Sequence, residues 1–243
     1  MTSDRQTSEM ILSARDICLS RDGNRLLDYV SLDIRRGSVT FLLGYNGAGK
    51  TLLLSCLHGL LELGSGSVDA PPRDRQKMVF QKPIIMRRTA AGHLRFVCPG
   101  VAETELADLM KRAGIQDRTS APARALSGGE QQKLALIGAL ATKPDILFLD
   151  EPTAHLDFAA TKFVEDIIQQ AHAAGTTIVM TTHNRSQAER LGQDVLFLDG
   201  GRLVEARPGL PYEFAPVEGR SRTVALALGA AEMLKLPVAK ARS

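Results

Sequence analysis

A run of eight residues in the first quarter of the chain has the types and spacing of a phosphate-binding loop, GxxxxGK[ST]. They are Gly44, Tyr45, Asn46, Gly47, Ala48, Gly49, Lys50 and Thr51. The glycines let backbone N–H groups turn toward phosphate oxygens, and the following helix adds its positive end to the same anion. Lys50 is expected to neutralise the β- and γ-phosphates of a nucleotide, and the Thr51 hydroxyl to ligate Mg²⁺. The alternative is a chance glycine-rich turn.

Two adjacent carboxylates follow another apolar run, Phe148-Leu149. Alone, two acids after such a run also fit a solvated turn. Combined with the phosphate-binding loop, they supply the other half of a nucleotide site. Asp150 at the strand end is predicted to hold the Mg²⁺ shell. Glu151, one residue later, is predicted to orient and deprotonate an attacking water.

A third motif, Leu126-Ser127-Gly128-Gly129-Glu130, precedes a helical run. Its local interpretation is a helix N-cap provided by the serine. A helix N-terminus opened by glycines is also an exposed anion site. The residues alone leave both interpretations open.

The elements that must position these motifs follow from hydrophobic periodicity. Alternating apolar residues between 17 and 34 indicate half-buried strands, and the apolar run 39–43 indicates a strand buried on both faces. Residues 51–63 favour a helix, and 89–140 form a helical insertion. Buried strands then alternate with helices up to a predicted hairpin at Asp199-Gly200-Gly201. The fold class is therefore α/β, with a mostly parallel sheet covered by helices.

The LSGGE segment, Leu126 to Glu130, resembles the signature of the ABC (ATP-binding cassette) ATPase family, and it stands in that family's order among the other motifs. The resemblance covers residues 17–205. It implies the family's P-loop NTPase core, a small antiparallel β subdomain and a helical subdomain. The expected ATPase domain spans residues 11–205, with its helical subdomain at about 82–141, and residues 206–243 form a C-terminal tail of unassigned structure.

The resemblance also assigns roles to single residues. It implies that Gln81 is the Q-loop glutamine, which senses Mg²⁺ and water, and that His183 is the switch histidine at the γ-phosphate. Asp157 corresponds to the D-loop acid. It further implies that two copies meet head to tail, so that Ser127, Gly128 and Gly129 of one copy face the ATP of the other.

The implied cofactors are ATP and Mg²⁺, and the implied partners are a transmembrane permease subunit, a second copy of the chain and an extracytoplasmic solute-binding protein. The formal net charge of +3 is spread along the chain, which argues against nucleic acid. Residues 1–9 lack the apolar stretch of a secretory signal. We therefore expect a cytoplasmic protein that is peripheral on the inner face of the membrane through the permease.

Competing functions within the P-loop class fit less well. A soluble ABC ATPase of DNA repair or translation would have a long coiled coil or a fused second cassette, and neither is present. A P-loop kinase or GTPase leaves His183 and the segment 127–130 unexplained. The strip 79–88 resembles the Q-loop region of oxyanion importers, particularly tungstate importers, with phosphate, amino-acid or other small-solute systems as alternatives.

Two further expectations concern contacts. Family members commonly stack an aromatic residue on adenine, but the matching position here is Asp22, so the sequence does not identify the stacking group. After Gln81, the apolar residues Ile84, Ile85 and Met86 followed by Arg87 and Arg88 fit a docking surface for the permease. The alternative is that these apolar residues pack in the core.

Overall fold

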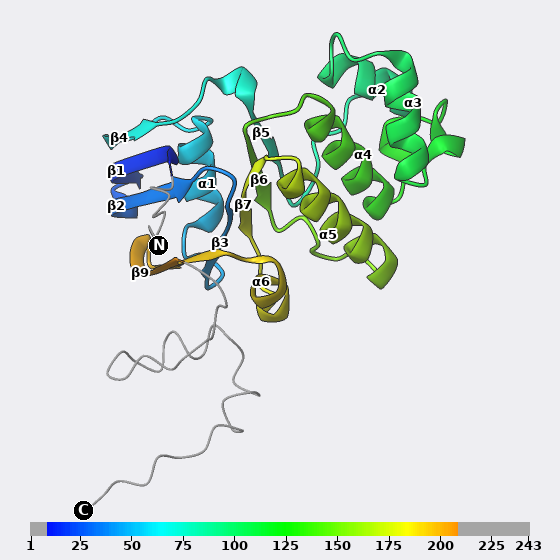
Figure 1. The fold of residues 1–243 in the computed structure, drawn as a ribbon. Coiled ribbons are helices and arrows are strands. Elements are labelled where there is room, and N and C mark those ends of the chain that lie inside the picture. Colours follow the sequence, from blue (N-terminus) through cyan, green and yellow to red (C-terminus); the bar gives the residue numbers. More distant parts are fainter. Residues whose placement is uncertain (1–8, 209–243) are drawn as a thin grey trace, which may run out of the picture.

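The structure is a computed structural model that describes residues 9–208 of the chain, with two sheets and a group of helices on one side (Figure 1). Three short 3-10 turns, Arg73–Arg75, Gln116–Arg118 and Ala123–Ala125, lie between the main elements. The helices and strands in chain order are β1 (Met10–Arg21), β2 (Asn24–Arg35), β3 (Val39–Gly44), α1 (Lys50–His58), β4 (Ser65–Asp69), β5 (Gln76–Val79), α2 (Ala90–Val97), α3 (Glu103–Arg112), α4 (Gly128–Ala141), β6 (Ile146–Asp150), α5 (Phe158–Ala173), β7 (Thr177–Thr181), α6 (Arg185–Leu191), β8 (Asp194–Asp199) and β9 (Arg202–Pro208).

The smaller sheet is antiparallel, with strand order β2-β1-β4. Its first two strands are joined by a tight turn in which Asp22 and Gly23 both have positive φ, 51° and 77°. Buried apolar and exposed polar residues alternate along β2, so one face of this sheet is buried and the other faces solvent.

The larger sheet has strand order β5-β6-β7-β3-β8-β9. The pairs from β5 to β8 are parallel, and β9 is antiparallel to β8 across the turn at Gly200 and Gly201. Since parallel strands end at the same edge, the phosphate-binding loop after β3, the carboxylates at the end of β6 and the polar residues after β7 emerge together.

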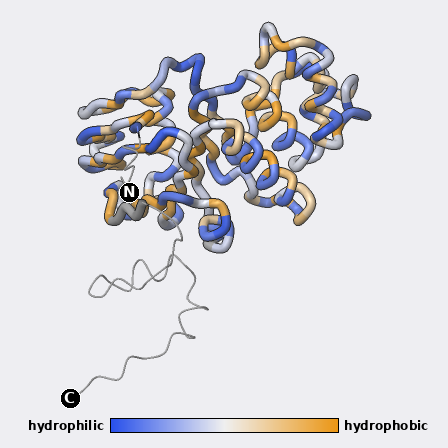
Figure 2. The backbone as a smooth tube through the Cα atoms, in the orientation of Figure 1, coloured by the Kyte–Doolittle hydropathy of each residue, from blue (hydrophilic) through white to orange (hydrophobic). Residues whose placement is uncertain are grey.

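Each face of the larger sheet packs into its own core. Leu42 faces α1 and the small sheet, whereas Phe41 and Leu43 face the side covered by α5, α4 and α6. Hydrophobic residues recur along the central strands and the helices beside them (Figure 2). This two-sided burial explains why β3, β6, β7 and β8 are almost continuously apolar.

A third core lies among the helices between β5 and β6. It contains buried residues of α2, α3 and α4, among them Leu94, Leu106, Met110, Leu134 and Ile137. The helix α4 also contributes Leu136 to the core against the sheet. One helix thereby connects the helical part to the sheet.

Three details differ from the sequence expectation or fall outside the structure. The helix α1 ends at His58, because Gly59 adopts a left-handed conformation with φ 77° that terminates it well before residue 63. Strand β4 was not expected, because its residues are mostly exposed and polar. Strand β9 runs to Pro208, and the remainder of the tail expected at 206–243 lies outside the described residues.

Within residues 9–208, none of the helices combines the length and apolar character needed to span a membrane.

Candidate functional site

A cavity of about 890 Å³ opens where α1 meets the carboxyl ends of β6 and β7. Most of the residues with expected chemistry line it or lie directly beneath it. Those that line it are Asn46, Gly47, Gly49, Lys50, Thr51, Gln81, Glu151 and His183.

The phosphate-binding loop is held by close backbone packing at its glycines. Gly44 has φ 155°, and a Cβ there would stand 2.2 Å from the carbonyl oxygen of Leu198. Gly49 is the N-cap of α1 in a left-handed conformation, φ 99°, with no side-chain cap. The loop's other end is fixed by Gly201, whose N–H donates to the Ala48 carbonyl at 3.0 Å. The first turn of α1 is thus left uncapped at the cavity wall.

Lys50 lies inside this loop and is only 6% exposed. Its Nζ donates to the carbonyls of Gly44 and Tyr45, both at 2.9 Å. Burial lowers the pKa of Lys50, and the nearby carboxylates of Glu151 and Asp150 partly oppose that shift. The hydrogen bonds of this buried ammonium go to neutral carbonyls, and a bound phosphate would give it a negatively charged partner.

Thr51, which lines the cavity, forms a hydrogen-bonded group with Asp150 and Thr181 behind it. The Thr51 hydroxyl donates to Asp150 Oδ2 at 2.8 Å, and the Thr181 hydroxyl donates to Asp150 Oδ1 at 2.8 Å. Thr181 Oγ1 also accepts the Glu151 N–H at 2.8 Å. Hydroxyl and carboxylate oxygens, with the Gln81 amide oxygen at the cavity wall, are the hard donors that Mg²⁺ prefers, so the residues fit that ion.

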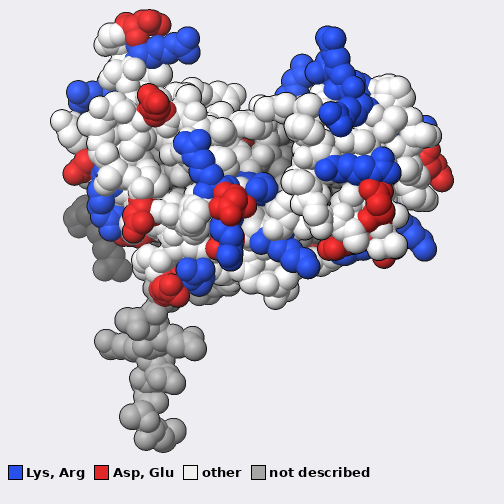
Figure 3. All heavy atoms as spheres, turned by 90° about the horizontal axis from the view of Figure 1, so that it is seen from above, with Lys and Arg blue, Asp and Glu red and all other residues white. Residues whose placement is uncertain are grey.

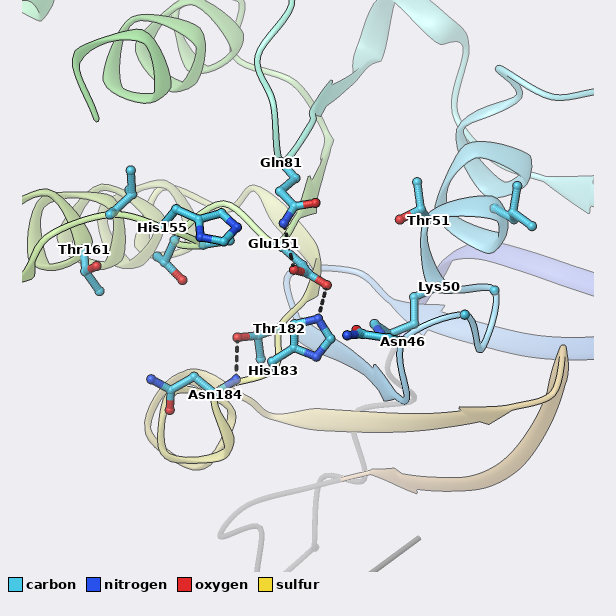
Figure 4. A pocket seen from close by; sticks show the side chains of 16 residues that line it. Asn46, Lys50, Thr51, Gln81, Glu151, His155, Thr161, Thr182, His183 and Asn184 are labelled. Carbon is cyan, nitrogen blue, oxygen red and sulfur yellow. Dashed lines mark hydrogen bonds and ion pairs between the residues drawn. The ribbon is translucent and has the colours of Figure 1, made fainter. Parts of the chain in front are cut away.

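Glu151 stands at the centre of the cavity wall, between residues from two other segments (Figure 4). Its Oε1 lies 2.5 Å from His183 Nε2, and its Oε2 accepts from Gln81 Nε2 at 3.2 Å. The residue follows the last residue of β6 and has φ 46°, a left-handed backbone conformation. The Glu151 side chain is only 14% exposed and that of His183 46%, and both residues line the cavity.

The LSGGE segment lies outside this cavity. Ser127 caps α4 in a capping box: its hydroxyl accepts the Glu130 N–H at 3.3 Å, and Glu130 Oε2 accepts the Ser127 N–H at 2.8 Å. Ser127 and Gly128 are exposed, and nothing lies within 4 Å of a Cβ placed on Gly128. Gly129 packs toward Ala160 of α5. The local interpretation as an N-cap therefore holds.

Asp157 also caps a helix, because its Oδ1 accepts the Ala160 N–H at 2.7 Å at the start of α5. The segment before it, Thr153 to Leu156, lines the cavity. His155 in that segment is part of the cavity wall and has φ 61° (Figure 4).

Several polar residues of the site escaped the sequence analysis. Thr182, Asn184 and Thr161 line the cavity, and Thr181 lies behind it. The signal available for Thr181 was its place at the end of a buried strand, next in the sequence to Thr182 and His183. Its partner became evident only through the pairing of Asp150 with Thr181 between β6 and β7.

In the strip after Gln81, only some of the apolar residues that we expected at a docking surface are exposed. Ile85 is 5% exposed and belongs to the helical core, so its assignment to a docking surface was wrong. Ile84 is 71% exposed and is the apolar residue that remains available. Arg124 Nε donates to the Ile85 carbonyl at 2.9 Å.

Comparison with known proteins gives one consistent family. The profile of the ABC transporter family matches residues 27–154. The chain is 35% identical over 210 residues to the tungstate uptake system ATP-binding protein TupC of Peptoclostridium acidaminophilum, covering 81% of this chain and 98% of that protein. It is 36% identical to the phosphate import ATP-binding protein PstB of Mycobacterium intracellulare, covering 82% and 79%.

Solved structures agree in fold. An ATP-binding subunit of an ABC transporter superposes with a TM-score of 0.76 at 25% identity, covering 82% of this chain and 90% of that one. The cbiO1 protein of Clostridium perfringens, part of the cbiONQ transporter complex, gives 0.71 at 26% identity, covering 83% and 89%. The family profile, the extent of the TupC match and the nucleotide-site geometry agree: this chain belongs to the ABC transporter family, as an ATP-binding subunit with ATPase activity that works within a transporter complex.

Proposed function

We propose that ATP hydrolysis in this chain is carried out by Glu151 as the general base, with His183 and Gln81 orienting it and the attacking water. One observation carries the proposal: the Glu151 carboxylate lies within 2.5 Å of His183 and 3.2 Å of Gln81 at the wall of the phosphate-loop cavity. A general base must reach the proton that it removes, and this carboxylate lines the cavity in which the attacking water would lie.

The phosphate-binding loop holds the triphosphate in this proposal. Its backbone N–H groups and Lys50 face the phosphate oxygens, and Lys50 exchanges its carbonyl partners for them. Thr51 and Asp150, with Gln81 beside them, would hold Mg²⁺, and the ion would supply charge neutralisation at the phosphates. Tyr45 and Ala48 belong to the loop's scaffold.

A second copy of the chain completes the site. The exposed start of α4, with Ser127, Gly128 and Gly129, lies outside the chain's own cavity, so it is available to the ATP of another copy. Asp157 and the cavity-lining segment before it would lie between the two sites. The functional unit is then a head-to-tail homodimer with two equivalent sites.

The permease contacts the exposed residues after Gln81. Ile84 provides the apolar centre, and Lys82, Arg87 and Arg88 are exposed around it. In the view of Figure 3, Lys and Arg side chains lie on both halves of the molecule, and one cluster of them stands at the upper edge of the helical half. Through this contact the chain sits at the inner face of the membrane, in a complex that includes an extracytoplasmic solute-binding protein and no nucleic acid.

Import of an oxyanion is the transport function that we propose, with tungstate as the first candidate. TupC, by its name, belongs to a tungstate uptake system, and PstB proteins of similar identity belong to phosphate import. Both solutes are tetrahedral oxyanions, so the class is better supported than the individual ion. Reconstituting the complex with its permease and comparing the uptake of tungstate, phosphate and an amino acid would decide which of these solutes is transported.

The hydrolytic role is tested by Glu151→Gln. The amide keeps the shape of the side chain and cannot act as a base, so we expect nucleotide affinity within about twofold of wild type and turnover lower by at least about a hundredfold. Steady-state ATPase and titration with a fluorescent ATP analogue measure the two quantities. Near-normal turnover in a folded variant would remove Glu151 from this role.

The docking surface is tested by a matched pair of neighbours. Ile84→Asp changes an exposed side chain, so it should fold normally, keep basal ATPase and lose co-purification with the permease. Ile85→Asp places a carboxylate in the helical core and should unfold that part. Normal assembly and transport by Ile84→Asp would exclude the surface.

A further inference from the structure

A buried glutamine connects the two segments that hold Glu151 and His183. Gln187 is the third residue of α6 and is 0% exposed. Its backbone N–H donates to Asn184 Oδ1 at 3.1 Å, the cap of the same helix. Because a buried amide without partners is costly, its hydrogen bonds indicate what the side chain does.

The amide of Gln187 joins three separate segments. Its Oε1 accepts from the Thr182 hydroxyl at 2.8 Å, directly before His183. Its Nε2 donates to Thr153 Oγ1 at 3.2 Å, two residues after Glu151, and to Glu165 Oε1 of α5 at 2.8 Å. Both ends of the side chain are therefore occupied.

Glu165 fixes the orientation of the amide. Its carboxylate is also bound by Arg190 of α6, at 2.6 and 2.7 Å, and its side chain is 14% exposed. A carboxylate accepts hydrogen bonds and cannot donate them, so the Nε2 end of Gln187 must face it. That leaves the oxygen end for the Thr182 hydroxyl, and a neutral amide satisfies both neighbours.

The two segments that Gln187 joins are turns, not regular structure. Glu151 has φ 46°, and His183 lies between the end of β7 and the start of α6. Their side chains meet at 2.5 Å. We propose that Gln187 is a positioning residue for ATP hydrolysis: its amide holds the Thr153 and Thr182 segments together, so that Glu151 and His183 stay in register over the cavity. This inference rests on the proposed roles of Glu151 and His183.

Gln187 acts on turnover rather than on nucleotide binding. Within residues 9–208, its hydrogen bonds go to Thr153, Thr182, Glu165 and the Asn184 cap, and none goes to the phosphate-binding loop. Displacing a reacting group by about 1 Å costs up to about a hundredfold in rate. Loss of the amide should therefore lower kcat by about 10- to 100-fold and leave the KM for ATP within about twofold.

The first test is Gln187→Met, which keeps the volume and removes the hydrogen bonds. Gln193→Met is the matched control, because Gln193 Oε1 accepts the Val39 N–H at 3.1 Å away from the cavity. Both variants should lose thermal stability, and only Gln187→Met should lose kcat at temperatures where both are folded. Normal kcat in folded Gln187→Met, or equal losses in the two variants, would overturn the inference.

A second test does not depend on the folding of that variant. Gln187→Glu sets two carboxylates against each other and should lose kcat, and adding Glu165→Gln restores a donor–acceptor pair. The double variant should recover kcat toward that of Glu165→Gln alone, and a folded double variant as slow as Gln187→Glu contradicts the inference. Glu151→Gln is measured in parallel: if it keeps turnover, the proposed base is wrong, whereas if it is inactive and Gln187→Met is normal, only the role of Gln187 fails.

Discussion

Within the described residues 9–208, two helices have glycines at their N-termini, α1 and α4, and the two ends are capped differently. At α1, Gly49 provides no side-chain cap, and the helix start faces a cavity lined by Lys50 and Glu151. At α4, Ser127 and Glu130 cap each other, Arg118 binds Glu130 at 3.0 Å, and the segment is exposed outside the cavity.

The difference shows what each end needs in order to act. The α1 end has a buried cation and a helix start without a side-chain cap beside a cavity, so it can hold phosphates within one chain. At the α4 end, the Ser127 hydroxyl already accepts the Glu130 N–H, and the segment does not line the cavity. This end therefore stays folded without a ligand, and it needs the nucleotide site of a second copy in order to act. Four substitutions test this contrast.

The largest effect is expected from Lys50→Ala. It removes the buried charge that we propose faces the phosphates, so ATP hydrolysis should fall below detection and nucleotide affinity should drop by about 10- to 100-fold. Titration with a fluorescent ATP analogue and steady-state ATPase measure both. If affinity and turnover were near normal, the α1 end would not be the phosphate site.

Gly128→Asp should abolish turnover without reducing nucleotide affinity. The site has room for a side chain, and an acidic residue in the first turn of a helix is favourable, so the Tm should stay equal or rise slightly. The new carboxylate would repel the triphosphate of a second copy. Calorimetry, affinity and ATPase are compared with wild type; full turnover would mean that the α4 end is not used.

Thr181→Val should have an intermediate effect on the α1 side of the contrast. The shape is kept, but the Glu151 N–H loses its acceptor and Asp150 loses a donor. We expect a loss of about 1 to 3 kcal/mol in unfolding free energy and about a tenfold lower kcat. Denaturant unfolding and ATPase assays measure these; unchanged values would show that water replaces the hydroxyl.

Glu130→Gln should have the smallest effect, on the α4 side. The Ser127 N–H and Arg118 lower the pKa of Glu130 below its ordinary value of 4.5, so its charge stabilises the fold above that pH and the benefit is lost as pH falls through the folded-state pKa. A glutamine keeps the capping box. The variant should melt about 1 to 3 °C lower at neutral pH, and the gap should close at acid pH. A gap that persists in acid would contradict this cause.

The contiguous motifs made the centre of the site predictable. The phosphate-binding loop, Asp150 and Glu151 each lie within a few residues of a strand end, so local pattern placed them on the correct edge of the sheet. The buried parallel strands were predictable from their continuous apolar runs. The cap at Ser127 was likewise visible as a serine before glycines and a glutamate.

What could not be predicted depends on pairing between distant segments. Thr181 and Gln187 look like ordinary polar residues until β6 is set beside β7 and α6 beside α5. Strand β4 forms by pairing with β1 and has no apolar alternation of its own. In the strip after Gln81, Ile84 and Ile85 are identical in type, and only the packed helices decide which one is buried.

The central claim, that each site is made from the α1 end of one copy and the α4 end of another, is tested most directly by mixing two inactive variants. Glu151→Gln keeps an intact α4 end, and Gly128→Asp keeps an intact phosphate-binding loop and Glu151. Random pairing makes half of the dimers mixed, each with one complete site, so the equimolar mixture should recover about a quarter of wild-type ATPase activity. A mixture that remains as inactive as its two components, with both proteins folded and binding ATP, would contradict a site shared between copies.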